Sequence, residues 1–269
     1  MTSYVYDPKS DIEKQRLLER DKRTSQRRSI ALDGLEIPDG SSILDVGCGS
    51  GVLGFDLLAR FPNSSLFCLD IEPSILIQAR RNRPSFGTTT FIASDAYGLP
   101  FGGNSFDVVA CQYLLQHLAD PIRTLREMRR VSKKGALAII FEWDDGANFI
   151  HPPLPAELDK VLEAKIELIN RRGGDRNIGR KLYHHLSAAG WEKIEVRLVQ
   201  DIWQGPDDRS AALKGTELSL LELKSQLLGE ALVSAAEFEL ALEQLYEFFN
   251  GDIFSVAFFF AANAINPGM

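Results

Sequence analysis

The chain contains 269 residues, of which 45% are hydrophobic and 25% are charged, and its formal net charge is −7. This composition is typical of a globular protein with one large domain and additions, and the acidic balance disfavours a protein that grips nucleic acid through its phosphates. Because no window approaches about 18 uninterrupted apolar residues and the N-terminus lacks the apolar core of a signal peptide, we expect no membrane span and a cytoplasmic location.

The cysteine and histidine residues do not form a metal-binding pattern. Cys48, Cys68 and Cys111 each lie in or just after a predicted buried strand, without a CxxC motif or a histidine-rich neighbourhood, as expected for core thiols in a reducing compartment. His184 and His185 are adjacent on a predicted helix, so their side chains point about 100° apart and cannot easily share a metal ion. We therefore expect no metal site.

Short apolar runs alternate with longer amphipathic stretches between residues 40 and 145. Before them, residues 13–28 are rich in lysine and arginine with interleaved acidic residues, which predicts an amphipathic helix with a solvated charged face. The alternation that follows is typical of strand-helix units that build a parallel sheet. The predicted strands are 42–47, 66–71, 89–96, 105–112 and 136–143, and the predicted helices are 52–61, 73–82 and 121–131.

Beyond Trp143 the pattern changes to longer helical stretches with fewer strands. The predicted elements are a proline-containing loop at 144–155, helices at 156–172 and 180–190, a strand at 192–203, two helical stretches within 207–249 and a terminal strand at 252–264. The sequence therefore predicts an α/β fold with a doubly wound, mostly parallel, seven-stranded sheet. Its expected parts are an N-terminal helical segment (1–39), an α/β core (40–145) and a C-terminal part with covering helices and the last strands (146–269).

A glycine-rich turn follows the first predicted strand, in the stretch "ILDVGCGSG" at residues 43–51. A strand that runs into such a turn and then into a helix presents free backbone N–H groups and a positive dipole end to a ligand. The stretch "GSGVLG" also satisfies G-x-G-x-x-G, and Asp70 lies near the expected spacing of about 20 residues further on. A dinucleotide-dependent oxidoreductase is therefore one hypothesis.

Acidic residues near the glycine turn favour a different ligand. Asp45, Asp70 and Asp95 lie at or near the carboxyl ends of the first three predicted strands, which is the edge where open α/β sheets bind ligands. No lysine or arginine joins them in those turns. A diphosphate would be repelled there, whereas a ligand with an amine, a ribose diol and an adenine amino group would suit all three carboxylates.

The successive stretches "DVGCGSG", "LDIEP", "SDA" and "FDVVACQYLLQHL" resemble the motifs of class I S-adenosylmethionine-dependent methyltransferases. The resemblance covers residues 40–145 in order and spacing, and "GRKLYHHLSAAGW" is similar to a later helix of the small-molecule members. The most similar type is the one that acts in quinone biosynthesis. The resemblance implies a Rossmann-like fold whose N-terminal and inserted helices form a substrate lid. It also implies S-adenosyl-L-methionine as the cofactor and S-adenosyl-L-homocysteine as its product.

The resemblance implies roles for the glycine turn. Gly47, Cys48, Gly49 and Gly51 would wrap the methionine part of the cofactor, and Asp45 would orient the turn and the cofactor amine. The residues themselves leave structural alternatives open. Asp45 is also suited to capping the helix turn that follows, and Gly51 to allowing tight packing between the helix and the strand.

Further roles follow for the ends of the next strands. Asp70 would accept both ribose hydroxyls, because two carboxylate oxygens match two vicinal donors. Ile71 would pack on the adenine, Asp95 would bind its amino group, and Ala96 would leave room for the ring. Gln112 would place its backbone carbonyl near the cofactor amine.

The acceptor side is less constrained, because methyl transfer by direct displacement needs alignment and exclusion of water, and a general base is optional. His151 is our first candidate for such a base and His117 the second, and Tyr113, Glu142 and Trp143 are candidates to bind the substrate. Tyr4 and Tyr6 are candidates to close over the cofactor, and frayed terminal aromatics are the alternative.

The sequence thus predicts methyl transfer to an oxygen, or alternatively a nitrogen or carbon, of a small organic metabolite. The alternatives are an NAD(P)-dependent oxidoreductase and a cofactor-binding protein of the same fold that does not methylate. Nucleic acid is disfavoured as a partner because basic and aromatic residues are not interleaved as in strand-binding proteins. We expect a monomer or a homodimer.

Overall fold

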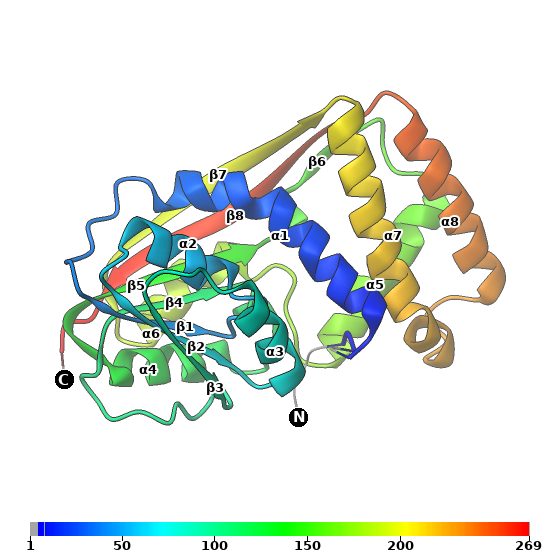
Figure 1. The fold of residues 1–269 in the computed structure, drawn as a ribbon. Helices are drawn as coiled ribbons and strands as arrows, with labels where there is room; N and C mark the ends of the chain where they lie inside the picture. The colour runs from blue at the N-terminus through cyan, green and yellow to red at the C-terminus, as the bar shows by residue number, and fades with distance from the viewer. Residues whose placement is uncertain (1–4, 8, 269) are drawn as a thin grey trace.

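The computed structural model describes residues 5–7 and 9–268, and at their centre lies an eight-stranded sheet (Figure 1). The strand order is β3-β2-β1-β4-β5-β8-β6, and β7 pairs with β8. The strands are β1 (Ser42–Val46), β2 (Ser65–Asp70), β3 (Thr88–Ala93), β4 (Phe106–Gln112), β5 (Ser132–Trp143), β6 (Phe149–His151), β7 (Glu192–Gln204) and β8 (Phe254–Ile265). The α/β fold predicted from the sequence is confirmed.

The first five strands are parallel and correspond to the predicted core strands. The central strands β1 and β4 are almost completely buried from Ile43 to Val46 and from Val108 to Cys111. Strands that are covered on both faces read as continuous apolar runs, and this is why the sequence revealed them. The parallel register brings the carboxyl ends of β1, β2 and β4 to one edge of the sheet.

The antiparallel part of the sheet is built on β8. Its later residues pair with β5, its first residues pair with the short strand β6, and β7 pairs along its whole length. The prediction of seven strands was therefore one strand short, because β6 lies inside the segment expected to be a loop. Three residues are too few to show the two-residue periodicity by which a strand is recognised.

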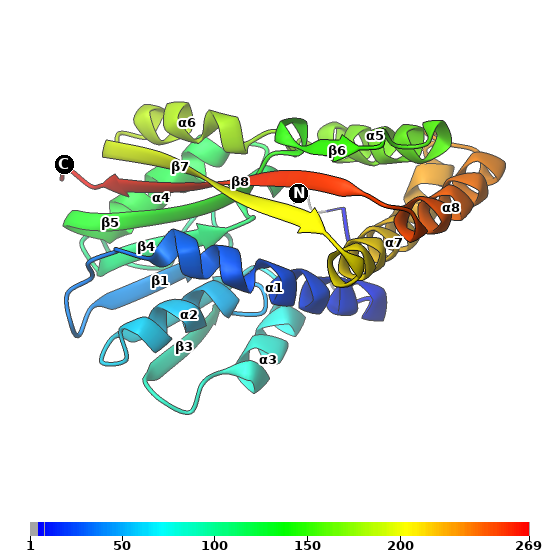
Figure 2. The ribbon, with the colours of Figure 1, turned by 90° about the horizontal axis from the view of Figure 1, so that it is seen from above.

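Helices cover both faces of the sheet (Figure 2). One face carries the helices α4 and α6 over an apolar cluster that includes Phe106 and Met128, and the opposite face carries α1 and α2 over a second cluster. The helices of these two layers are α1 (Asp11–Leu32), α2 (Val52–Arg60), α3 (Pro73–Asn82), α4 (Pro121–Val131) and α6 (Leu182–Ala188). The fold is therefore doubly wound, as predicted.

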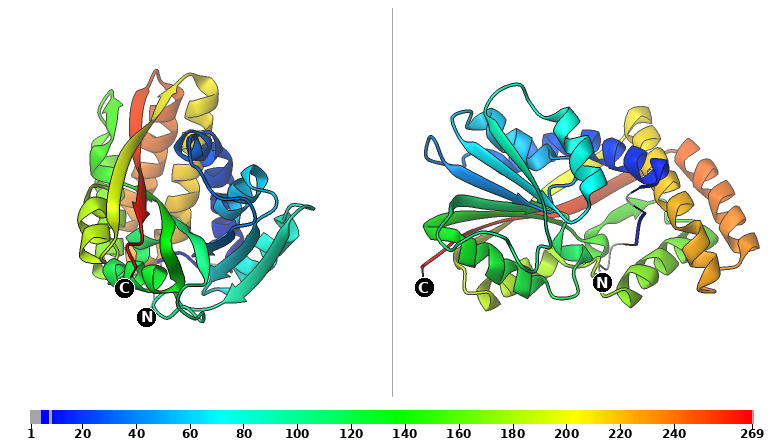
Figure 3. Two further views of the ribbon diagram at one scale, coloured as in Figure 1. Left: turned by 90° about the vertical axis from the view of Figure 1, so that its left-hand side faces the viewer. Right: turned by 60° about the horizontal axis from the view of Figure 1, so that its bottom comes forward.

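Three further helices pack together beyond one end of the sheet (Figure 3). They are α5 (Ala156–Arg171), α7 (Pro206–Gly229) and α8 (Ala235–Asn250). Their shared apolar cluster includes Leu168, Leu223 and Phe238, and Tyr6 packs into it. No helix in the described part of the chain is both long enough and apolar enough to cross a membrane.

The N-terminal helix α1 connects this helical layer to the sheet. The side chain of Ser10 caps α1 by accepting the N–H groups of Ile12 and Glu13, and its hydroxyl donates to Glu222 on α7 at 2.6 Å. Further along α1, Arg28 forms an ion pair with Asp56 on α2 at 2.7 Å. The helix thus extends past the carboxyl edge of the parallel strands.

Candidate active site

The glycine turn after β1 has the conformation that only glycine adopts easily. Gly47, Gly49 and Gly51 have φ values of 65°, 53° and 89°. A Cβ atom on Gly47 would lie 2.7 Å from the side chain of Leu114, and one on Gly51 would lie 2.5 Å from the ring of Phe55. Apart from the two chain neighbours, no heavy atom of the described residues would lie within 4 Å of a Cβ on Gly49. Close packing therefore requires Gly47 and Gly51, whereas Gly49 leaves open space for a ligand.

A cavity of about 460 Å³ lies beside this turn, at the carboxyl edge of the parallel strands. Its volume is in the range of small-molecule sites, which is roughly 300–1,000 Å³. Except for Gly51, every residue that the resemblance assigns to the cofactor lines this cavity: Asp45, Gly47, Cys48, Gly49, Asp70, Ile71, Asp95, Ala96 and Gln112. Gly51 does not line this cavity, and the ring of Phe55 fills the space beside its Cα atom, which agrees with the packing alternative.

Asp70 connects the glycine turn to the loop after β2. One of its carboxylate oxygens accepts the N–H of Gly49 at 2.9 Å, and the other accepts the N–H of Glu72 at 3.0 Å. Burial raises the pKa of Asp70, and these backbone hydrogen bonds partly offset that effect. Each carboxylate oxygen has a second lone pair, so the side chain keeps the capacity to accept two further donors.

Two other residues of the cavity contain buried polar atoms without a partner in the described part of the chain. Asp45 Oδ2 accepts the N–H of Gly54 at 3.0 Å, but Oδ1 has no partner, and both polar side-chain atoms of Gln112 are in the same state. Burial raises the pKa of Asp45 to about 7, a bond from Gly54 lowers it, and the charge of Asp70 adds to the increase. These atoms fit a cofactor with an ammonium group and further donors, because buried polar groups normally have partners.

The far end of the cavity is formed by the loop after β3. Asp95 accepts the N–H of Tyr97 at 2.9 Å, Ala96 is buried, and the side chain of Ile71 is 49% exposed. An apolar side chain with an open face beside a carboxylate is suited to an adenine ring. Tyr97 also lines the cavity, and its hydroxyl accepts the N–H of Asp120 at 3.0 Å.

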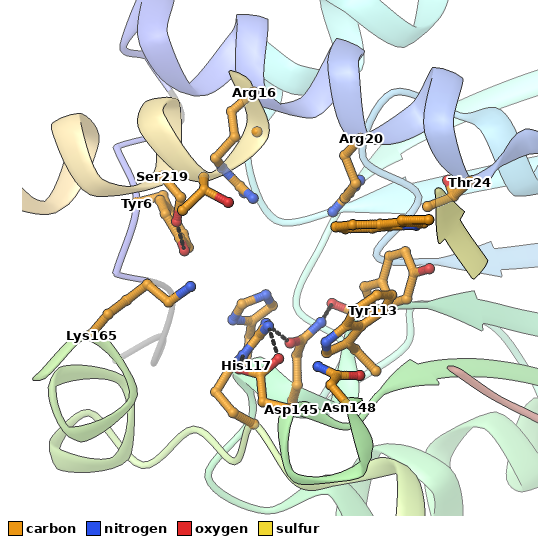
Figure 4. A pocket seen from close by; sticks show the side chains of 16 residues that line it. Tyr6, Arg16, Arg20, Thr24, Tyr113, His117, Asp145, Asn148, Lys165 and Ser219 are labelled. Carbon is orange, nitrogen blue, oxygen red and sulfur yellow. Dashed lines mark hydrogen bonds and ion pairs between the residues drawn. The ribbon is translucent and has the colours of Figure 1, made fainter. Parts of the chain in front are cut away.

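A second cavity of about 200 Å³ adjoins the first (Figure 4). The residues that line both cavities are Tyr6, Arg20, Tyr113 and His117. The smaller cavity is enclosed by α1, α5, α7 and the segments that follow β4 and β5. It thus lies between the carboxyl edge of the sheet and the helical layer. Tyr4, the other aromatic residue considered for closing the site, lies outside the described residues.

Tyr113 marks the boundary between the two cavities. Its φ of 55° is unusual for a residue with a side chain, and its N–H donates to the carbonyl of Phe141 at 2.8 Å. The guanidinium of Arg20 lies 5.3 Å from the centre of its ring, and the ring of Trp143 lies 6.5 Å away. Strained backbone of this kind is common at ligand sites.

Salt bridges organise the walls of the smaller cavity. Arg16 on α1 binds Glu13 through two hydrogen bonds of 2.6 and 2.8 Å, and Glu13 is completely buried. Arg176 binds Asp145 through two hydrogen bonds of 2.8 Å. The expectation of a solvated charged face on residues 13–28 was therefore wrong in part, because one polar stripe of the helix faces the protein interior.

The two candidate bases lie in different places. His117 belongs to the short 3-10 helix η1 (Leu115–His117) and lines both cavities. His151 is exposed on β6 and is not among the residues that line either cavity. The structure therefore brings our second candidate to the site and not our first.

Among the candidates for substrate binding, Tyr113 and Trp143 line the smaller cavity, but Glu142 lines neither cavity. The carboxylate of Glu142 is completely buried and accepts the N–H of Leu115 at 2.6 Å, so it supports η1 from behind. Burial raises the pKa of Glu142 to about 8. In the structure this buried carboxyl is hydrogen-bonded to the segment that carries His117.

Sequence reasoning missed the remaining polar residues of the smaller cavity. They include Arg16, Arg20, Lys165, Arg176 and Ser219. One side of α1 carries Arg16, Arg20 and Thr24, because they are spaced by four residues. This spacing was the feature of the sequence that could have predicted them as neighbours. Within residues 5–7 and 9–268, no group of histidine, cysteine, aspartate and glutamate side chains is arranged to hold a metal ion.

The family model that matches this chain, and the named relatives similar to it, are methyltransferases. Residues 44–140 match the family described as "Methyltransferase domain". The demethylmenaquinone methyltransferase of Paenarthrobacter aurescens is 31% identical over 140 residues, which are 49% of this chain and 48% of that protein. The chain spans about half or less of the length of the first curated relatives that it matches.

Solved structures share the fold. A protein from Bacillus halodurans named as a methyltransferase has a TM-score of 0.60 at 18% identity, covering 90% of this chain and 100% of that one. Phosphoethanolamine N-methyltransferase 2 of Haemonchus contortus, solved with S-adenosyl-L-methionine, has a TM-score of 0.54 at 18% identity, covering 91% of this chain and 53% of that one. Residues 44–140 thus match a methyltransferase domain, and the chain shares its fold with solved methyltransferase structures.

Proposed function

We propose that this protein transfers a methyl group from S-adenosyl-L-methionine in the larger cavity to an oxygen of a small organic molecule in the smaller cavity. The observation that carries the proposal is the junction of the two cavities at Tyr113 and His117. A methyl donor on one side of this junction and an acceptor on the other can meet in the alignment that direct displacement requires.

The cofactor side of the proposal assigns each polar group of the larger cavity. Asp70 accepts the two ribose hydroxyls, Asp45 and Gln112 bind the ammonium end, and Asp95 binds the adenine amino group. Glycine at position 49 permits close approach of the methionine part, since no atom fills the space beside it. When bound, the cofactor supplies a methyl group on a positively charged sulfur with its own leaving group.

The residues on the acceptor side exclude water and accept the proton that the acceptor hydroxyl loses. Desolvation and then the positive charges of Arg176, Arg16 and Arg20 hold the pKa of His117 well below its ordinary value. The imidazole is therefore neutral near pH 7 and can accept the proton of an acceptor hydroxyl as its oxygen bonds to the methyl carbon and the carbon-sulfur bond breaks. In this proposal His117 replaces His151 as the base.

The electrostatics also favour oxygen over nitrogen as the acceptor atom. Most aliphatic amines are protonated near neutral pH, and a protonated amine would be repelled by the arginines that surround His117. A neutral or acidic hydroxyl meets no such repulsion. The cytoplasmic location and the choice between monomer and homodimer remain predictions from the sequence.

An oxidoreductase is not favoured, because the matched domain and the named relatives are methyltransferases. Titration calorimetry with S-adenosyl-L-homocysteine and with NAD tests the cofactor directly. We expect micromolar or tighter binding of the first and no measurable binding of the second. Tighter binding of NAD would contradict the proposal.

Transfer is tested by incubating the protein with methyl-labelled S-adenosyl-L-methionine and a pool of small hydroxy compounds. We expect label in the small-molecule fraction, and its loss in the variant Asp70→Ala. A protein that binds the cofactor but transfers no label to any pool would instead support the alternative of a non-methylating cofactor-binding protein.

A further inference from the structure

The smaller cavity contains more positive than negative charge. Its lining cations are Arg16, Arg20, Lys165 and Arg176, and Asp145 is the one carboxylate among the lining residues that the structure describes. Such an excess is unusual in a chain with a net charge of −7. A cavity lined in this way attracts and concentrates anions.

Carboxylates in the wall or behind it compensate three of these cations. The pairs are Arg16 with Glu13, Arg20 with Asp21, and Arg176 with Asp145. Lys165 differs from them, since its ammonium group makes no hydrogen bond or ion pair with any residue in the described ranges. Four cations and three paired carboxylates leave one surplus positive charge, and Lys165, whose charge also acts on Asp145, is the cation without a direct ion pair in the described ranges.

The pKa of Tyr6, which lines the cavity, responds to this charge. Burial alone would raise the pKa of Tyr6, but the positive charges of Arg16, Lys165 and Arg176 outweigh it and the pKa is lowered. The pKa of His117 is lowered mainly by desolvation, and the charges of Arg176, Arg16 and Arg20 add to this effect. The lowered pKa of Tyr6 thus indicates a positive potential in the space that an acceptor would occupy.

Lys165 is positioned to act on that space. It projects from α5 toward the cavity, while Arg16 and Arg20 project from α1 on the other side (Figure 4). The residue is half-buried, and a half-buried charge without a partner is unfavourable. An anionic group of a ligand placed between α5 and α1 would provide the missing partner.

We propose that the acceptor is a small organic acid, and that Lys165 binds its single carboxylate while the rest of the molecule lies against Tyr113 and Trp143. The inference depends on the methyl transfer proposed above. One surplus positive charge matches one carboxylate, whereas a phosphate monoester with about two negative charges would leave one of them uncompensated. The volume of about 200 Å³ is below that of sites for drug-sized ligands, roughly 300 Å³ and above.

The same arrangement orients the acid. Lys165 lines only the smaller cavity, whereas His117 and Tyr113 line both. A carboxylate held by Lys165 is therefore the end remote from the cofactor, and the hydroxyl that accepts the methyl group lies at the junction beside His117. The carboxylate is an anchor and is itself not methylated.

Binding of benzoate and of its neutral analogue benzamide tests the inference. Titration calorimetry is performed with and without saturating S-adenosyl-L-homocysteine on the wild type and on Lys165→Met, Lys165→Arg and Lys160→Met. Lys160 is a matched control because it lies on the same helix, is mostly exposed and pairs with Glu237 on α8. Phenylphosphonate serves as the probe with higher charge.

We expect the wild type to bind benzoate at least about tenfold more tightly than benzamide, as for one charge-assisted hydrogen bond. Lys165→Met should abolish this preference, Lys165→Arg should restore part of it, and Lys160→Met should leave it unchanged. An equal affinity for benzoate and benzamide in the wild type, or a preference that survives in Lys165→Met, would overturn the inference. Tighter binding of phenylphosphonate than of benzoate would overturn the assignment of a single carboxylate.

The affinity for S-adenosyl-L-homocysteine separates this inference from the proposed function. All three lysine variants should bind it within about twofold of the wild type, which also shows that they are folded. If the wild type fails to bind it while still preferring benzoate, the proposed function fails and the anion site stands. If it binds and no preference for benzoate exists, only the inference fails.

Discussion

Replacement of Asp70 is the most direct test of the cofactor site. The carboxylate accepts the N–H groups of Gly49 and Glu72 at 2.9 and 3.0 Å, one on each oxygen. Each oxygen can accept one more donor, which gives two charge-assisted hydrogen bonds to a ribose diol. Asp70→Ala removes both acceptors together with the negative charge.

The magnitude follows from the number of bonds. A hydrogen bond to a charged group contributes about 1.5–3 kcal/mol, so loss of two costs about 3 kcal/mol or more even if water replaces part of the interaction. We therefore expect Asp70→Ala to weaken binding of S-adenosyl-L-homocysteine by at least about 100-fold. Asp70→Asn keeps one acceptor oxygen and should lose less, by about tenfold.

The assay is titration calorimetry, with thermal unfolding measured in parallel because the mutation also leaves the N–H groups of Gly49 and Glu72 without their acceptor. Asp33→Ala serves as the control, since this carboxylate is 66% exposed and pairs with Arg60 on the surface. A folded Asp70→Ala protein whose affinity is within threefold of the wild type would refute the assignment of the larger cavity to the cofactor.

Three further predictions concern the pH dependence and the packing of the site. The pKa of Asp45 is raised to about 7, and a bound ammonium group favours its ionised form, so the affinity for S-adenosyl-L-homocysteine should rise by up to tenfold per pH unit toward pH 7 and then level off. Calorimetry from pH 5.5 to 8.5 measures this profile, and an affinity that does not change with pH contradicts the prediction. Burial raises the pKa of Glu142 to about 8, so its contribution to stability decreases as pH rises from about 4.5 to 8. In urea unfolding, the free energy of unfolding of Glu142→Gln, which can still accept the N–H of Leu115, should therefore increase relative to that of the wild type over this range, and a difference that is constant with pH would argue against a buried neutral carboxyl. Gly47→Ala should lower the free energy of unfolding by about 1–3 kcal/mol because of its positive φ and its approach to Leu114, and wild-type stability in that variant would show that the turn is not constrained.

The core of the fold was predictable because its signals are local. Strands such as β1 and β4 are buried on both faces, so each appears in the sequence as a continuous apolar run with nearly the observed bounds. The glycine turn is equally local, since its positive φ values require glycine at particular positions. Asp45 and Asp70 follow directly, because the carboxyl ends of parallel strands always meet at one edge.

The smaller cavity was not predictable in the same way, because it depends on which elements pack against each other. The charge pattern of α1 predicted one solvated face, but α1 packs against α7, and Arg16 and Arg20 face the cavity between them. Lys165 approaches them from α5, which is far away in sequence. The sequence of an amphipathic helix does not indicate which other element a single lysine on it will face. For the same reason the sequence ranked His151 above His117, whereas packing places His117, and not His151, beside the two cavities.

The sequence by itself thus determined the α/β core, the turn and the row of carboxylates, since each depends on residues close together in the chain. Only the tertiary structure decided which charged side chains face the acceptor. A charged side chain is buried when a partner beside it offsets the cost of removing the charge from water. Elements that are remote in the sequence supply that partner.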